Sequence, residues 1–529
     1  MNRPMTANRR PAGRAVCWSQ AAPVRPPAAR QPGPRARTAA ARRNKPGLSG
    51  GVTGRNVTGT HPLTREQDNS RLGQYEHSIK QAFDRIEPAL RDIAARQHDR
   101  DFESQAQRIA ESALGFPLPA RILDHAWVEQ LDMRTLFAWA VFETYRRFAE
   151  DFFRRDPLAD EDAEDFEAFL QSCGFHSFDI SPCADGRLAH VVRYALRLPM
   201  RHVRRKSYAG AMFDVEESLD RWVETELNRY REGVPNTADE PTRYLKVAMY
   251  HFSSSAPGVE GCAAHGSDVD RAAAAALERL LDFQRAIQNS FCCGASIDLL
   301  LLGIDTDTDA LRAHVPDGDG VLAVDRFVDA AKAYEETRRL SPRDAEDAIT
   351  GMAAACAAAG DGAPAPGGMI RLIARLVANN FSQIDYVGRN FGGTYPDIGH
   401  QERFIGAGRG FDEIQLRNLT YFAHLNTVEE SAADLDVGIR IFSHLNAERG
   451  LPIPVVVRFD YRGDVPGARD RAVERCARVD HALRARYAEL ADHGLLHTML
   501  AVRDCRGNAA IEIVGTSLDA GMAPLEGAH

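Results

Sequence analysis

Two cysteines and one histidine, far apart in the sequence, have the side chains that bind zinc in catalytic sites. Cys183 opens the segment Cys183-Ala184-Asp185-Gly186-Arg187, and His251 and Cys262 follow much later in the chain. Two thiolates and one imidazole make three protein ligands, which leaves the fourth position of a tetrahedral zinc for water or substrate. Structural zinc sites fill all four positions, so this set predicts a metal that takes part in chemistry.

The spacing within the first segment predicts a polar face beside the metal. In extended backbone, alternate side chains point the same way, so Cys183, Asp185 and Arg187 would share one face. A bidentate contact from Arg187 would keep the Asp185 carboxylate ionised and off the metal, free to accept a hydrogen bond from the metal's water or hydroxide. A competing interpretation is that Asp185-Gly186 is only a turn after a strand.

Other cysteines and histidines offer competing ligand sets. Cys262 and His265 form a compact Cys-x-x-His pair, which could supply two ligands from one turn. His251 ends a strand-like run at 243–252, so from the residues alone both histidines remain candidates. Free cysteines behave as small hydrophobic residues, and we interpret the adjacent Cys292 and Cys293 as core. The remaining cysteines have no motif support: Cys17, Cys173, Cys356, Cys476 and Cys505.

Several segments together resemble the carboxysomal (epsilon-class) carbonic anhydrases, a divergent branch of the beta type. The likeness rests on the segment at 183–187, on His251 and on Cys262 within the glycine-rich stretch 258–266. Ordinary beta-type enzymes place the histidine only three residues before the second cysteine, whereas here the two are eleven apart. Two further segments, at 207–214 and 379–386, add to the resemblance, which extends over about residues 72–518.

The resemblance implies zinc-dependent, reversible hydration of CO2 to bicarbonate. It favours His251 over His265 as the ligand beside Cys183 and Cys262. Asp185 would then accept a hydrogen bond from the nucleophile, and Arg187 would orient Asp185. Two thiolates donate more charge than two imidazoles would, so the zinc should be a weaker Lewis acid than in a three-histidine site. We therefore expect activity that rises toward alkaline pH.

His400 is the expected proton carrier. Each hydration turnover must export one proton, and a histidine is the usual carrier because its pKa lies near neutrality. His400 lies in a loop rich in glycine and proline, within the region shared with the family. The hypothesis is that its ring moves the proton between the zinc site and solvent.

The first 65 residues differ in composition from the rest of the chain. They contain thirteen Arg or Lys residues and no Asp or Glu, which leaves a net charge of about −22 on the remainder. This composition predicts a disordered basic arm. An N-terminal segment rich in arginine and free of acidic residues is also typical of an organellar transit peptide. Such an arm could bind an acidic protein, a nucleic acid or an anionic membrane, or only aid solubility. The resemblance favours tethering to Rubisco or to shell proteins inside the carboxysome, with no nucleic acid or membrane partner.

The rest of the chain predicts an α/β (α+β) protein with three domains and a tail at 519–529. Residues 66–157 show apolar stripes at helical spacing, which predict an N-terminal helical domain. Residues 158–402 alternate short apolar strands with helices, one of which we expect to begin at about Leu188. We therefore expect a sheet covered on both faces and place the zinc catalytic domain here. Residues 403–518 repeat this pattern without the cysteine ligands, with one helix expected over about 468–491. The resemblance implies that they form a degenerate copy of the catalytic domain.

Several classes of protein are disfavoured by composition. No apolar run reaches the approximately 18 residues that a membrane span needs, so we expect a soluble protein. Nine cysteines, an odd number in a long chain, argue against a disulfide scaffold and for a reducing compartment. The run Asp305-Thr306-Asp307-Thr308-Asp309 lacks the glycine and the final glutamate of a calcium-binding EF-hand, so we interpret it as a polar strand exit.

Two other functions remain open from the sequence. A zinc deaminase would need a glutamate in a His-x-Glu motif at the ligand, and none accompanies His251. A noncatalytic carboxysome scaffold, with a structural zinc and a basic tethering arm, is the second alternative. If residues 403–518 are a copy of the catalytic domain, one chain would mimic the dimer of beta-type enzymes. We expect such chains to associate further, as homodimers or larger oligomers.

Overall fold

The computed structural model of the chain describes residues 60–126, 128–156, 166–199, 203–234, 236–237, 241–290, 296–360, 365–424, 432–507 and 510–518. Most of the expected basic arm, the pair Cys292 and Cys293, and the tail at 519–529 lie outside these residues. The last residues of the expected arm are described, and there the buried ring of His61 lies 3.0 Å from the hydroxyl of Thr337.

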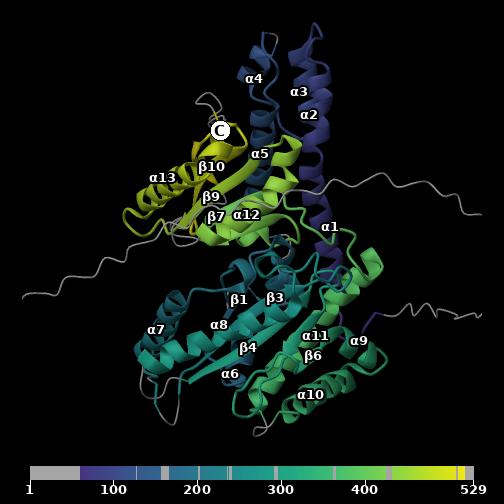
Figure 1. Ribbon diagram of the computed structural model, residues 1–529, viewed down its shortest axis with the longest axis vertical. Coiled ribbons are helices and arrows are strands. Elements are labelled where there is room, and N and C mark those ends of the chain that lie inside the picture. Colours follow the sequence, from purple (N-terminus) through teal and green to yellow (C-terminus); the bar gives the residue numbers. More distant parts are fainter. Residues whose placement is uncertain are drawn as a thin grey trace, which may run out of the picture. The chain divides into compact units, whose positions relative to one another are not determined.

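Five helices form the N-terminal region (Figure 1): α1 (Glu66–Asp84), α2 (Ile86–Ala95), α3 (Phe102–Ala113), α4 (Ala120–His125) and α5 (Met133–Arg154). Asp132 caps α5 by accepting hydrogen bonds from the backbone N–H groups of Arg134 and Thr135. The apolar stripe of α5 is buried, with Leu136 and Tyr145 fully enclosed. The expected helical region is therefore confirmed, and the stripe serves as core.

A six-stranded sheet follows in the sequence. Its strands lie in the order β2-β1-β3-β4-β5-β6. The first four strands are parallel, whereas β5 and β6 are antiparallel to their neighbours. The bounds are β1 (Ser177–Pro182), β2 (Arg204–Arg205), β3 (Arg243–Phe252), β4 (Ser296–Asp305), β5 (Leu311–His314) and β6 (Phe327–Asp329).

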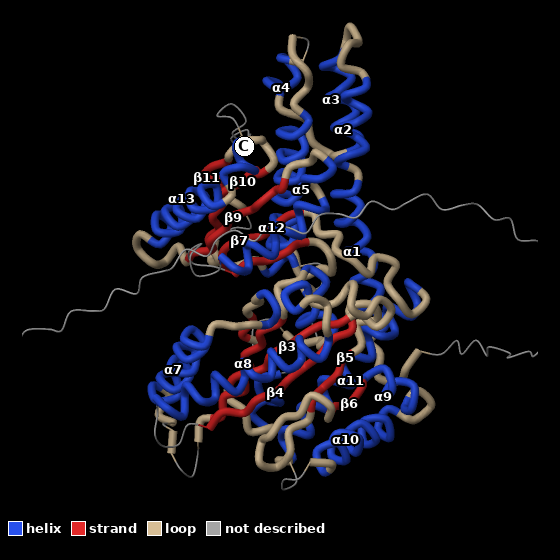
Figure 2. Tube along the Cα trace, viewed as in Figure 1, coloured by secondary structure: helices blue, strands red, loops and turns tan. Residues whose placement is uncertain are grey.

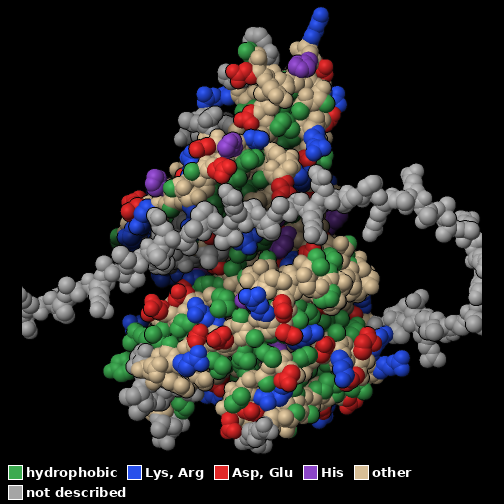
Figure 3. Space-filling view, viewed as in Figure 1, with side chains coloured by type: hydrophobic (Ala, Val, Ile, Leu, Met, Phe, Trp, Pro, Cys, Tyr) green, Lys and Arg blue, Asp and Glu red, His purple; other side chains and the backbone are tan. Residues whose placement is uncertain are grey.

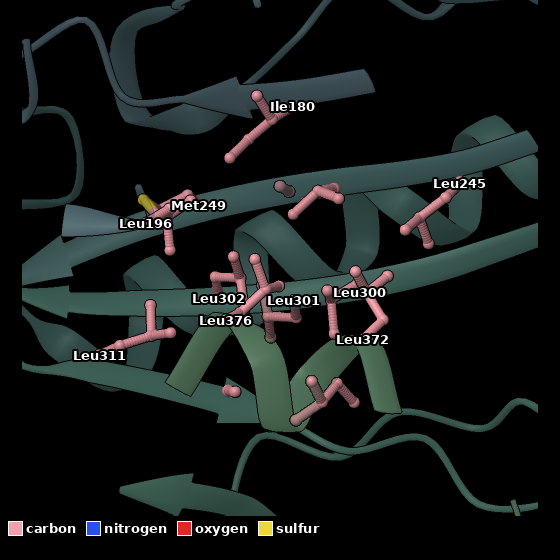
Figure 4. Close-up of a cluster of buried hydrophobic side chains, with 14 of the residues drawn as sticks. Ile180, Leu196, Leu245, Met249, Leu300, Leu301, Leu302, Leu311, Leu372 and Leu376 are labelled. Carbon is pink, nitrogen blue, oxygen red and sulfur yellow. The ribbon is translucent and has the colours of Figure 1, made fainter. Parts of the chain in front are cut away.

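Helices cover this sheet and bury its apolar strands. Helix α8 packs against β3 and β4, and α11 packs against β5. Figure 4 shows Leu372 and Leu376 of α11 beside Leu300 and Leu302 of β4. Burial on both faces explains why these strands are nearly continuous runs of apolar residues. The helices are α6 (Phe166–Ser172), α7 (Val215–Arg231), α8 (Val269–Ser290), α9 (Ala330–Thr337), α10 (Pro342–Ala358) and α11 (Gly367–Phe391).

A second sheet, of five strands, forms from the C-terminal part of the chain (Figure 2). Its order is β11-β10-β9-β7-β8, and α12 and α13 pack against it. The strands are β7 (Phe404–Arg409), β8 (Thr420–His424), β9 (Ile453–Tyr461), β10 (Leu496–Asp504) and β11 (Glu512–Thr516). The helices are α12 (Ala432–Leu445), α13 (Ala468–Arg486) and α14 (Ala488–Asp492).

The two sheets share one topology. Reading from β8, the second sheet runs β8-β7-β9-β10-β11, which matches β2-β1-β3-β4-β5 strand for strand. In both sheets the first three pairings are parallel and the fourth is antiparallel. This correspondence supports the expectation that the C-terminal part is a copy of the catalytic fold. The predicted α/β class, with a helical N-terminal region and two sheets, is confirmed.

The predicted helix from about Leu188 is wrong. The structure has a short 3₁₀ turn at Gly186–Leu188, followed by a π-helical turn at Val191–Ala195. The Asp185 side chain accepts a hydrogen bond from the Arg187 backbone N–H and so fixes the tight turn. A helix predicted over 468–491 is also divided, because the backbone breaks at Tyr487 between α13 and α14.

The acidic run after β4 forms a polar turn. Asp305 accepts hydrogen bonds from Ser254, and Asp307 accepts them from Ser253 and Ser255. Asp309 has the left-handed φ of 57°. The carboxylates therefore tie the end of β4 to the segment that follows β3, as expected for a strand exit.

Within the described ranges, no helix is long and apolar enough to cross a membrane. On the face shown in Figure 3, acidic and basic side chains are interspersed with hydrophobic ones.

Candidate metal centre

The fold brings Cys183, His251 and Cys262 together. Their ligand atoms all lie within 4.8 Å of one another, and all three side chains are buried. The two sulfurs are 3.9 Å apart. Two sulfurs at about 2.3 Å from a tetrahedral zinc would be separated by roughly 3.8 Å, so the cysteine pair fits such an ion. The His251 Nδ1 is buried without a hydrogen-bond partner, as expected of a ring with capacity for a further ligand.

The carboxyl ends of two adjacent parallel strands position two of these ligands. Cys183 directly follows β1, and its backbone N–H donates to the carbonyl of Met249 on β3. His251 is the penultimate residue of β3. Cys262 precedes a short 3₁₀ turn at Ala263–His265. The ligands thus lie at the edge where parallel sheets commonly build their sites.

His265, the rival ligand, lies outside this cluster. Its Nε2 is 3.1 Å from the carbonyl oxygen of Gly210. Gly210 has a φ of +65°, and its backbone N–H lies 3.3 Å from the sulfur of Cys183, which accepts its hydrogen bond. A Cβ at Gly210 would come within 2.6 Å of the His265 ring, so only glycine suits this position. His265 therefore contacts the loop that supports Cys183.

The electrostatics of the cluster suit a cation. A shared hydrogen bond with Cys262 and burial raise the pKa of Cys183, whereas that same bond lowers the pKa of Cys262. Burial would lower the pKa of His251, but Asp185 and Cys183 raise it to about 9. A metal bound here would displace the protons of the thiols and of the ring, because only deprotonated ligands bind it.

Asp185 and Arg187 form a buried, bidentate ion pair beside the cluster. The Arg187 Nε and Nη2 lie 3.0 Å and 2.7 Å from the two carboxylate oxygens. Burial would raise the pKa of Asp185, but Arg187 and His400 hold it well below its usual range. The carboxylate oxygen Oδ2 lies 3.1 Å from the Nε2 of His251. Asp185 is therefore ionised and adjacent to the ligands.

Arg187 also donates to three backbone carbonyls in two other segments. Its Nη1 donates to the carbonyls of Glu260 and Ile398, at 2.6 Å and 2.9 Å, and its Nη2 donates to Gly261 at 3.2 Å. These carbonyls precede Cys262 and His400 closely in the sequence. One guanidinium group thus fixes the position of Asp185, of the Cys262 loop and of the His400 loop.

His400 lies at the outer side of the same site. Its Nε2 is 3.8 Å from Asp185 Oδ2, and its side chain is 20% exposed. Its Nδ1 is 3.0 Å from Glu402 Oε1. Burial would lower the pKa of His400, but Glu402 and Asp185 raise it to about 9. The ring therefore bridges the interior of the site and solvent.

Comparisons with known proteins now identify the family. Family models of the carboxysome shell carbonic anhydrase match three consecutive regions: the N-terminal model at 61–153, the catalytic-domain model at 165–400 and the C-terminal model at 401–518. The chain belongs to the carboxysome shell carbonic anhydrase family. The expected family is therefore confirmed, and the chain is a member of a family of enzymes.

Named relatives cover nearly the whole chain. The carboxysome shell carbonic anhydrase of Prochlorococcus marinus (strain MIT 9313) is 56% identical over 463 residues, which span 87% of this chain and 89% of the relative. The relative from Parasynechococcus marenigrum (strain WH8102) is 56% identical over 473 residues, 89% of this chain and 80% of its own. The relative from Halothiobacillus neapolitanus (strain ATCC 23641 / c2) is 46% identical over 464 residues, which span 86% of this chain and 90% of the relative.

Sequence reasoning missed two residues that shape this site of the carboxysome shell carbonic anhydrase fold. Glu402 accepts a hydrogen bond from the Gly186 backbone N–H and contacts His400. Asn418 donates its own N–H to the Gly186 carbonyl and its side-chain amide to Gly399. Both fall in the region matched by the C-terminal model. The spacing His400-Gln401-Glu402 was a signal for Glu402, whereas Asn418 had none.

We predict that Cys183→Ser removes the metal. A serine hydroxyl is a poor substitute for a thiolate, so metal content measured by mass spectrometry should fall from about one ion per chain to near zero. Cys356→Ser, on helix α10 and outside the cluster, is the matched control and should retain the ion. Equal metal content in both variants would mean that the cluster does not hold the ion.

Proposed function

We propose that this chain is a zinc-dependent carbonic anhydrase that interconverts CO2 and bicarbonate in the carboxysome and supplies CO2 to Rubisco. The proposal rests on the family, whose named relatives are carboxysome shell carbonic anhydrases. The observation that carries the chemistry is the cluster of Cys183, His251 and Cys262, with an ionised carboxylate beside it. Three protein donors leave one position of a tetrahedral zinc open.

Zinc held by these three residues would lower the pKa of water enough to supply the nucleophile that attacks CO2. Asp185 remains ionised, so its oxygens only accept hydrogen bonds and orient whichever donor approaches them. Arg187 binds both of these oxygens and prevents the carboxylate from rotating into the ligand cluster. The pair thereby keeps one position available for substrate.

His400 moves the proton that hydration releases. Its Nε2 faces Asp185 inside the site, while part of its ring is exposed to solvent. The ring accepts a proton only when it is neutral, and its pKa is about 9. The carrier therefore becomes more effective as the pH rises toward that value, which agrees with the alkaline activity expected from two thiolate ligands.

The basic arm supplies the attachment to other carboxysome components. Residues up to Arg65 carry thirteen positive charges and no negative ones, which suits an acidic surface on Rubisco or on shell proteins. Two related sheets in one chain already form the pair that two subunits would otherwise provide. Assembly into homodimers or larger oligomers is part of the proposal.

A stopped-flow assay of CO2 hydration and bicarbonate dehydration tests the proposed activity. We expect activity in both directions, loss of activity after chelation, and recovery when zinc is added back. The hydration rate should rise from pH 7 to pH 9, because the His400 ring loses its proton over this range. A chain that holds zinc but shows no activity would support the scaffold alternative, and a flat pH profile would contradict the assigned proton carrier.

Asp185→Asn tests the role of the ion pair. The amide keeps the shape of the side chain but loses the charge, and we expect kcat/KM to fall by about 100-fold while the metal is retained. Asp282→Asn, which removes a partner of Arg285 on the exposed side of α8, is the control and should leave kcat/KM unchanged. Similar kcat/KM values for Asp185→Asn and the intact chain would exclude Asp185 from the mechanism.

Removal of residues 1–59 tests the tether. We expect this deletion to abolish co-sedimentation with Rubisco or with shell proteins and to leave CO2 hydration intact. Binding by the full chain should weaken as salt is added, because exposed charges are screened beyond about 8 Å at physiological ionic strength. Unchanged co-sedimentation and packaging after the deletion would rule out tethering by the arm.

A further inference from the structure

Glu402 is a buried carboxylate that contacts two parts of the site, although it is neither a metal ligand nor a neighbour of one in the sequence. Its side chain is fully buried. Its Oε1 accepts a hydrogen bond from the Gly186 backbone N–H at 3.2 Å and lies 3.0 Å from the Nδ1 of His400. Burying a carboxylate costs free energy unless hydrogen bonds or opposite charges compensate it, so we looked for the role of these contacts in the site.

Gly186 makes room for this carboxylate. A Cβ at position 186 would lie 2.5 Å from the Cγ of Glu402 and 2.7 Å from its Oε1. Any other residue would therefore displace Glu402 or the turn that carries Asp185 and Arg187. The glycine in the Asp185-Gly186-Arg187 segment is thus explained by the close approach of Glu402 to the backbone.

The contacts of Glu402 set the tautomer of His400. A carboxylate oxygen offers only lone pairs, so with Glu402 as a carboxylate its Oε1 accepts from both the Gly186 N–H and the Nδ1–H of His400. In the neutral ring the lone pair then resides on Nε2. This Nε2 is the nitrogen that faces Asp185, at 3.8 Å from Oδ2.

A bound cation is the competing explanation for this cluster. Ligand atoms of Asp185, His400 and Glu402 all lie within 4.8 Å of one another. Arg187, however, binds both oxygens of Asp185, and the Gly186 N–H and the His400 Nδ1–H are both directed at Glu402. A cation at this cluster would be repelled by the guanidinium group that binds both oxygens of Asp185. The arrangement favours proton transfer.

We propose that Glu402 is a positioning residue for proton transfer, which fixes His400 with hydrogen on Nδ1 and the acceptor Nε2 directed at Asp185. Each CO2 hydrated releases one proton, His400 takes it at Nε2, and the exposed edge of the ring passes it to buffer. The ring then returns to its neutral form. This inference rests on the proposed function, because it requires His400 to be the carrier.

The charges around His400 agree with this role. Glu402 and Asp185 raise the pKa of the ring, and Arg187 opposes them. Glu260 approaches the neighbouring Gly399, with its Oε2 3.3 Å from the position of a Cβ there. Because Glu402 is hydrogen-bonded to Nδ1, its carboxylate should stabilise the protonated His400 ring more than the other charged neighbours of the ring do.

Glu402→Gln tests the proposal in the full, zinc-loaded chain. The variant removes the charge and nearly preserves the shape, so we expect the pH midpoint of kcat to fall by about half a unit or more. The kcat/KM for CO2, which precedes proton release, should stay within about twofold. His400→Ala should lower kcat by about tenfold or more in dilute buffer, and added imidazole should restore it. In the double variant, Glu402→Gln should have no further effect.

Two controls separate positioning from general effects. Glu448→Gln alters another histidine–glutamate pair, in which the Nδ1 of His444 lies 2.7 Å from Glu448 on the surface, and should leave the midpoint unchanged. Glu402→Asp keeps the charge but withdraws it by one methylene, and should give a smaller shift in the same direction. This second variant also serves if the glutamine variant fails to bind zinc.

Three results would overturn the proposal. If neither Glu402 variant shifts the midpoint while His400→Ala still lowers kcat and imidazole restores it, His400 acts without Glu402 and the proposed function stands. If Glu402→Gln lowers kcat and kcat/KM together and imidazole gives no recovery, Glu402 only supports the Gly186 turn. If His400→Ala leaves kcat unchanged, His400 is not the carrier, and the proposed proton route fails together with this inference.

Discussion

The buried ion pair between Asp185 and Arg187 is the constraint on which the site depends. Removing one member of a buried pair leaves the other charge without compensation, which typically costs about 3–5 kcal/mol. Arg187 uses its remaining N–H groups on carbonyls of the loops that lead to Cys262 and His400. The same guanidinium group therefore pairs with Asp185 and positions both loops, so a change in one set of contacts would disturb the other.

Much of this site follows from the chemistry of single residues. Cysteine and histidine at strand ends are strong metal signals. The segment 183–187 correctly pointed to Asp185 and Arg187 as neighbours of the cluster, although a 3₁₀ turn, and not the extended backbone expected there, joins them. The parallel strands were also readable, because β3 and β4 are buried runs of apolar residues bounded by turns. The likeness to a known family supplied the choice of His251, which the residues alone left open against His265.

The unpredicted features depend on contacts between distant parts of the chain. Glu402 approaches Gly186 across 216 residues of sequence, and no local pattern encodes that meeting. The antiparallel strands β5 and β6 are only four and three residues long, too short for a periodic signal. The apolar residues from Leu188 onward suit a helix, whereas the Asp185 side chain caps a tighter 3₁₀ turn. These three features are determined by tertiary contacts, which the local sequence does not encode.

The matching strand orders of the two sheets have a consequence for how such a protein can change. In a symmetric pair of identical subunits, every substitution occurs in both subunits. A substitution that removes a metal ligand therefore removes it from both sites at once. Joining the two folds in one polypeptide removes that coupling. One half can then lose its own metal ligands, bury an ion pair such as Arg458 of β9 with Glu413, and contribute Asn418 to the site of the other half. Covalent linkage thus permits division of labour between duplicated halves.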